Sequence, residues 1–152
     1  MNKNIVALGI FYTSAIILSI STAAQAEMGQ NAVGPSIGIS DGKVYFGVDS
    51  KFIINETLSV RPFVYFPRRG AIFGAGLTYD FNVADPVKPS QVTPFVGGAV
   101  AVATGSNSTT AVYITGGADF NVTNNIQFKA ALDVPLTGGQ NTQATFTAGY
   151  RF

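Results

Sequence analysis

The chain has 152 residues, a formal net charge of +1 and only 11% charged side chains, against about 25% in ordinary soluble domains. It contains no cysteine and no histidine, which excludes disulfides, thiol chemistry and any mechanism that depends on a histidine base. The near balance of nine basic and eight acidic residues leaves no electrostatic footprint for nucleic acid.

The first 26 residues have the features of a secretory signal peptide. Lys3 supplies a positive start, Ile5–Ile20 is mostly apolar, and Ala24-Gln25-Ala26 has the small-x-small form of a cleavage site. The alternative is a transmembrane anchor, but a spanning helix needs roughly 20 apolar residues and this run is shorter. We therefore predict a cleaved signal peptide over residues 1–26 and one domain over residues 27–152.

After the leader, apolar and polar residues alternate with a period of two, and Gly, Asn, Asp and Pro interrupt the pattern. No segment there shows a sustained helical period. The pattern predicts eight strands: Pro35–Ser40, Lys43–Phe52, Leu58–Phe66, Ala71–Phe81, Val92–Ala103, Thr110–Phe120, Ile126–Leu136 and Gln143–Phe152.

Three local features refine this prediction. Asp41-Gly42 is a strong signal for a tight hairpin turn. Pro62 lacks an N–H group, so we expect strand pairing to be interrupted or bulged at that position. Val92–Ala103 is apolar on both faces, so the pattern does not predict which of its side chains face inward.

Eight strands of this length suit a minimal transmembrane barrel, in which each strand needs about 9–11 residues and the strand number is even. Closure removes the sheet edges, which lipid would not tolerate unpaired. The sequence therefore predicts an all-β fold, an eight-stranded antiparallel up-and-down transmembrane β-barrel. A secreted soluble β-barrel or sandwich is the alternative, in which the polar faces are solvated.

The expected inward-facing positions carry four acidic and four basic side chains. The interior of an eight-stranded barrel is just wide enough to be filled by side chains, and an unpaired buried charge is very costly. We predict that these groups form an internal ion-pair network that plugs the lumen: Asp49, Lys51, Arg61, Asp80, Asp119, Lys129, Asp133 and Arg151. We interpret Phe63, Tyr65 and Tyr113, on the same face, as packing residues rather than a ligand site.

Aromatic residues lie near the strand ends on the apolar face. We predict that they form an interfacial girdle, although the core of a soluble sandwich is the alternative: Phe52, Phe66, Phe81, Phe120, Tyr150 and Phe152. Arg68 and Arg69 lie at an expected loop tip. They could contact lipopolysaccharide phosphates, but a solvated turn is the favoured interpretation.

Four stretches carry a resemblance to a known group: Gly74–Phe81, Thr93–Gly98, Gly117–Ile126 and the C-terminal Gly149–Phe152. They resemble the small outer-membrane β-barrels of the OmpA/OmpX-like and opacity-protein superfamily. The resemblance implies an outer-membrane location in a Gram-negative-type envelope, with membrane lipid and the barrel assembly machinery as partners. Phe146, Tyr150 and Phe152 would then form the assembly signal.

The resemblance also places four connections outside the cell, and all four are shorter than the loops that adhesins of the group display: Ser40–Lys43, Pro67–Gly70, Ser106–Thr109 and Thr137–Asn141. It places Asn82–Gln91 in the periplasm, where a tighter turn is usual. Both departures argue against an adhesive role.

Small barrels that act as lipid A acyltransferases, lipid A deacylases or proteases rely on a catalytic histidine, and this chain has none. We predict no catalytic residues, no metal site and no cofactor. The expected function is a non-enzymatic structural, envelope-integrity or surface role for a monomeric barrel. A porin-like small-solute channel or a ligand-binding barrel is the alternative.

Overall fold

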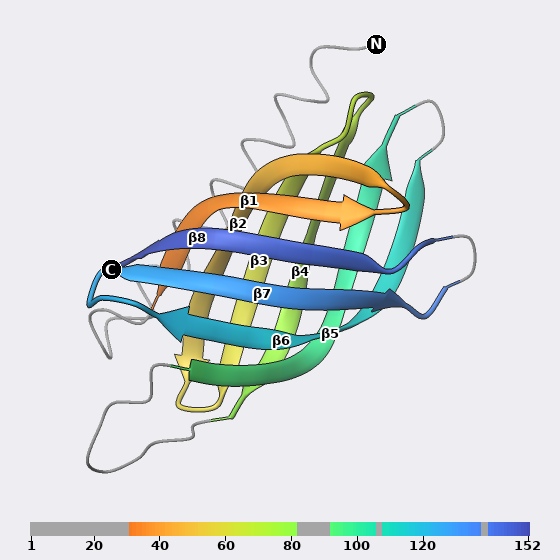
Figure 1. Cartoon of the computed structure of the whole chain (residues 1–152). Coiled ribbons are helices and arrows are strands. Elements are labelled where there is room, and N and C mark those ends of the chain that lie inside the picture. Colours follow the sequence, from red (N-terminus) through yellow and green to blue (C-terminus); the bar gives the residue numbers. More distant parts are fainter. Residues whose placement is uncertain (1–30, 82–91, 106–107, 138–139) are drawn as a thin grey trace.

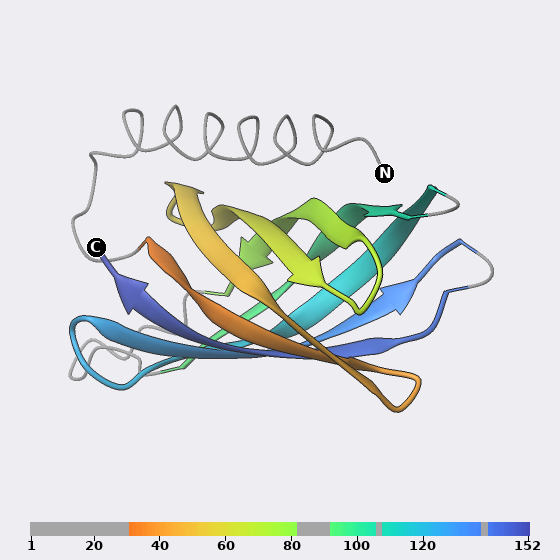
Figure 2. The same ribbon diagram turned by 90° about the horizontal axis from the view of Figure 1, so that it is seen from above.

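The computed structural model describes residues 31–81, 92–105, 108–137 and 140–152. Eight antiparallel strands close into a barrel in which each strand pairs with its neighbours in sequence and β1 pairs with β8 (Figures 1 and 2). The strands are β1 (Ala32–Ser40), β2 (Lys43–Asn55), β3 (Leu58–Phe66), β4 (Ala71–Asp80), β5 (Val92–Thr104), β6 (Thr109–Asn121), β7 (Ile126–Pro135) and β8 (Gln143–Arg151). The predicted fold class is confirmed.

The predicted signal peptide over residues 1–26 and the Asn82–Gln91 connection lie outside the described residues. Within the described part of the chain, no helix has the length and hydropathy needed to cross a membrane.

The barrel has two distinct ends. The β1–β2, β3–β4, β5–β6 and β7–β8 connections lie at one end, which we call the hairpin end (Figure 1). The C-terminal Phe152 and the β2–β3 and β6–β7 turns lie at the other, which we call the terminal end. Asp41 and Gly42 both have positive φ values, of 50° and 67°, as a two-residue hairpin turn between right-twisted strands requires. The turn predicted at these two residues is confirmed.

The in–out alternation of the strands puts apolar residues outside and polar residues inside. Phe46 is 64% exposed and Leu132 56% exposed on the outer face, whereas the Asp119 carboxylate inside is fully buried. This arrangement is the inverse of a soluble domain, in which large apolar side chains gather inside and charges stay in water. It is the pattern of a barrel whose outer face contacts lipid.

Pairing with its neighbours resolves β5, whose faces the sequence pattern left open. Phe95, Ala99 and Ala101 are buried inside, whereas Val96 and Val100 are exposed outside. The assignment follows from the register with β4, since Phe95 lies opposite Asp80 and Ala101 opposite Gly74.

Pro62 interrupts pairing on one side only. The β3–β4 register includes it opposite Ala75, but between the described strands β2 and β3 it has no register partner. The Ser50 hydroxyl instead donates a hydrogen bond to the Pro62 carbonyl, at 2.8 Å. The predicted interruption is confirmed, and it falls beside Arg61, a principal residue of the interior.

An arginine introduced on the outer face tests its contact with lipid. Val100 is 49% exposed and lies opposite Ala75 in the middle of β4, whereas Val44 is 54% exposed beside the hairpin end. We expect Val100→Arg to lower the free energy of unfolding by about 2–4 kcal/mol and Val44→Arg by about 0–1 kcal/mol, because a charge costs most at the bilayer midplane. Equilibrium unfolding from lipid vesicles measures both. Equal losses at the two sites would contradict a lipid-facing belt.

Candidate functional site in the barrel interior

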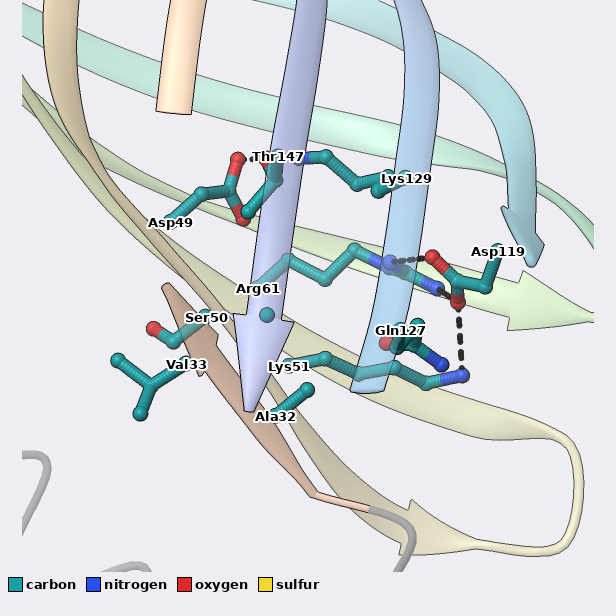
Figure 3. Close-up of a pocket in the computed structure, with 11 residues that line it drawn as sticks. Ala32, Val33, Asp49, Ser50, Lys51, Arg61, Asp119, Gln127, Lys129 and Thr147 are labelled. Carbon is teal, nitrogen blue, oxygen red and sulfur yellow. Dashed lines mark hydrogen bonds and ion pairs between the residues drawn. The ribbon is translucent and has the colours of Figure 1, made fainter. Parts of the chain in front are cut away.

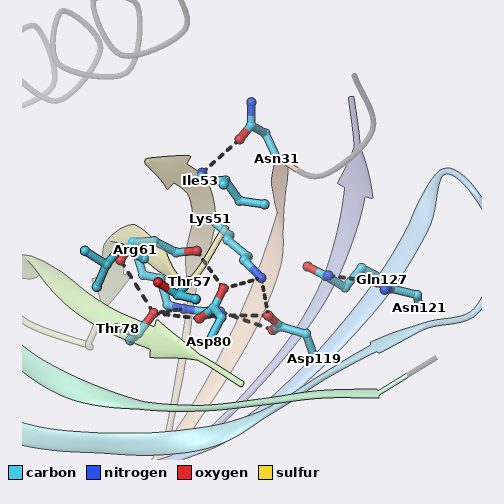
Figure 4. Close-up of polar contacts among 12 residues, drawn as sticks. Asn31, Lys51, Ile53, Thr57, Arg61, Thr78, Asp80, Asp119, Asn121 and Gln127 are labelled. Carbon is cyan, nitrogen blue, oxygen red and sulfur yellow. Dashed lines mark hydrogen bonds and ion pairs between the residues drawn. The ribbon is translucent and has the colours of Figure 1, made fainter. Parts of the chain in front are cut away.

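Two cations and two carboxylates form a closed ring inside the terminal end of the barrel (Figure 4). The Lys51 Nζ lies 2.7 Å from an Asp80 oxygen and 2.9 Å from an Asp119 oxygen. The Arg61 Nη2 lies 3.1 Å from the other Asp80 oxygen and 2.8 Å from Asp119. All four side chains are buried. Each cation therefore bridges both carboxylates, and the four charges cancel; we call this set the charge ring.

Neutral groups complete the hydrogen bonding of the ring. The Arg61 Nε donates to the Thr78 hydroxyl at 2.9 Å, and the Ser59 hydroxyl donates to Asp80 at 2.6 Å. The Arg61 guanidinium also lies 3.8 Å from the centroid of the Phe95 ring, a cation–π contact. Buried ion pairs are stable only when such additional contacts offset the loss of water. Arg61 meets this condition on every side of its planar head group.

Ser59, Thr78 and Phe95 were not among the predicted site residues. Ser59 and Thr78 share the inward face with Arg61 and Asp80, so the period-two pattern contained the signal for both. Phe95 had no such signal because its strand is apolar on both faces.

A second ion pair joins opposite parts of the sheet nearer the middle of the barrel. Lys129 of β7 pairs with Asp49 of β2 (Figure 3). The Tyr65 hydroxyl lies 2.9 Å from the Ser36 hydroxyl, and its ring is 2% exposed, which confirms its expected packing role. The cavity between this pair and the charge ring has a volume of only about 10 Å³, no more than one water molecule needs.

Two of the eight predicted network residues join neither group. Within the described ranges, Asp133 and Arg151 form no ion pair. Arg151 lies at the terminal end of β8 and donates to the Thr123 carbonyl at 3.5 Å. Asp133 accepts a hydrogen bond from Thr115, its register partner on β6. The prediction that all eight charges pair is therefore wrong for these two, because their register neighbours are neutral.

A larger cavity of about 230 Å³ occupies the hairpin end. Phe63 and Tyr113 line it, so their predicted role as packing residues is incomplete. Gly74 lies opposite Phe63, and a Cβ at Gly74 would lie 2.7 Å from the Phe63 ring. The glycine thus provides room for the ring. We call this space the hairpin-end cavity.

Five of the six predicted girdle residues are exposed on the outer face: Phe66, Phe81, Phe120, Tyr150 and Phe152. Phe52 is different, since its side chain is only 1% exposed. The in–out alternation of burial is lost over Asp49–Phe52, shortly before the β2–β3 register shifts, so Phe52 is not an exposed girdle residue. Whether the other five meet a membrane interface stays a prediction.

The remaining predicted residues lie on the surface. Phe146 is exposed on the outer face of β8, as Tyr150 is. Arg68 and Arg69 are exposed in the β3–β4 connection. Among the described residues, acidic side chains nowhere form a group of three that could hold a metal ion.

No protein-family model matches the sequence, and no curated protein sequence matches it. The fold is that of small transmembrane β-barrels. The N-terminal β-barrel domain of Pseudomonas aeruginosa OprF is 17% identical, with a TM-score of 0.64 over 82% of this chain and 98% of that one. A de novo designed transmembrane β-barrel is 12% identical, with a TM-score of 0.66 over 83% and 98%. The designed barrel TMB2.3 is also 12% identical, with a TM-score of 0.62 over 84% and 98%.

Removing one cation of the charge ring tests its energetic role. We expect Arg61→Met to lower the free energy of unfolding by about 3–5 kcal/mol, because Asp119 and Asp80 each lose a buried partner. Lys43→Met is the matched control, since Lys43 pairs with Asp41 at 3.7 Å on the exposed rim and should cost about 0–1 kcal/mol. Denaturant unfolding of both variants provides the comparison. An Arg61 variant as stable as the control would refute the role of the ring.

Proposed function

We propose that the protein is a non-enzymatic integral outer-membrane barrel with a structural, envelope-integrity role, exported by cleavage of residues 1–26. The observation that carries this proposal is the exposed apolar outer face around a buried, charged interior. A secreted soluble barrel would hold side chains such as Phe46 and Leu132 in water over a continuous surface. Soluble monomers rarely expose contiguous apolar patches larger than a few hundred Å².

The interior supports a closed lumen rather than a porin-like channel. The charge ring and the Lys129–Asp49 pair lie across the barrel, and the space between them is about 10 Å³. Opening a path for a solute would require separating buried charges that have no other partners. A structural role is therefore favoured over the small-solute channel.

The hairpin end is proposed to face outside the cell, with the terminal end in the periplasm. Phe146, Tyr150 and Phe152 would be read by the barrel assembly machinery, and the closed sheet needs no second copy to complete its pairing. For the exposed Arg68 and Arg69 we favour a solvated turn over a lipopolysaccharide contact.

Gel mobility with and without heating tests the outer-membrane assignment. We expect the protein in the outer-membrane fraction, with an unboiled band in SDS that migrates faster than the boiled band, because a closed barrel stays compact in detergent. A protein recovered from the soluble periplasm or medium, with no shift on boiling, would contradict the assignment.

Conductance across planar lipid bilayers tests the closed lumen. We expect the wild-type barrel to show no stable open level. The double substitution Arg61→Ala and Asp119→Ala should show open events, because it removes both charges and volume while Lys51 and Asp80 stay paired. Steady wild-type conductance would favour the channel alternative. A double variant that keeps its heat-shifted band and remains closed would show that the ring is not the plug.

A further inference from the structure

Pairing inside the barrel leaves an uncompensated negative charge at the hairpin end. The charge ring is neutral, and Lys129 is taken by Asp49. At the rim, Asp41 and Lys43 pair with each other and are both well exposed. Asp133 remains, without an ion-pair partner in the described part of the chain, and it lines the hairpin-end cavity.

Aromatic side chains from three other strands line the same cavity. Tyr45 comes from β2, Phe63 from β3 and Tyr113 from β6. Tyr113 lies opposite Pro135 and Thr115 opposite Asp133, so Tyr113 and Asp133 are diagonal neighbours on the inner face. The cavity thus combines one free carboxylate with three aromatic rings.

This combination selects one chemical class of ligand. Aromatic faces attract cations, and quaternary ammonium groups are bound by aromatic cages in this way. An anion would meet the Asp133 charge, and a hard metal ion would require several oxygen ligands that the cavity does not gather. The volume of about 230 Å³ exceeds the roughly 30 Å³ that each water occupies in the liquid. A small organic cation satisfies the charge, the rings and the size together.

We propose that the hairpin-end cavity binds one small organic ammonium cation, with Asp133 as its counter-ion and Tyr45, Phe63 and Tyr113 around it. The charge ring lies beyond the cavity toward the terminal end, so the site is a blind pocket rather than part of a path. The proposal goes beyond the envelope role, because a barrel closed by the ring need not bind anything.

The test uses choline and its neutral carbon isostere 3,3-dimethylbutan-1-ol. The folded barrel is extracted from the membrane in octyl glucoside, which has no ammonium group to compete. NMR shifts of the Tyr45 and Tyr113 amides report occupancy. We expect choline to bind saturably, at least about tenfold tighter than the alcohol. Equal affinities, or no saturable shift with choline, would overturn the proposal.

Matched variants locate the counter-ion. Asp133→Asn should weaken choline binding at least about tenfold, and Tyr113→Leu at least about threefold. Asp41→Asn makes the same charge change at the rim, where the carboxylate already pairs with Lys43, and should change affinity by less than about twofold. If Asp133→Asn and Tyr113→Leu both bind choline as wild type does, the assignment is wrong.

Two further arms separate other causes. Each variant must keep its heat-shifted band, so a failed barrel is distinguished from a failed site. Glycerophosphocholine carries the same ammonium group as a lipid headgroup but adds a phosphate. Weaker binding than choline supports a free cation as ligand, whereas tighter binding would overturn that assignment in favour of a headgroup.

Discussion

The narrow interior of a closed eight-stranded sheet is the constraint on which the rest of this structure depends. An outer face that meets lipid forces the polar residues inward, into a space only as wide as their own side chains. A charge placed there has no bulk water and must find its partner across the barrel. Arg61 shows the result, since its guanidinium contacts two carboxylates, a hydroxyl and an aromatic ring at once.

The two ends of the barrel answer this constraint differently. The terminal end is filled by long charged side chains that reach one another across the lumen. Toward the hairpin end, β4 and β5 present small residues to the interior, among them Gly74, Ala99 and Ala101. Small residues leave room for the aromatic rings of facing strands but do not fill the remaining space. A closed half and an open half therefore follow from side-chain size alone, within one regular sheet.

The sequence was enough to predict the strand number, the faces of seven strands and the pool of interior charges, because a period of two is a local property of the chain. It was not enough to predict which charges meet. Asp119 lies opposite Lys129 in the β6–β7 register, yet Lys129 turns to Asp49 and Asp119 is bound by Lys51 and Arg61. Partners on distant strands depend on how the sheet closes, and no local pattern encodes that.

The pairings at one end of the barrel determine the charge at the other. Asp119 accepts three hydrogen bonds, from Lys51 and from both terminal nitrogens of Arg61, and it is fully buried. With these partners in place, its register neighbour Lys129 is free to pair with Asp49. Lys129 is then no longer available to Asp133 on the same strand, whose own register neighbours, Thr115 and Gln143, are neutral. The negative charge of the hairpin-end cavity is therefore a consequence of the charge ring, and the ring that closes the lumen also creates the electrostatic character of the pocket above it.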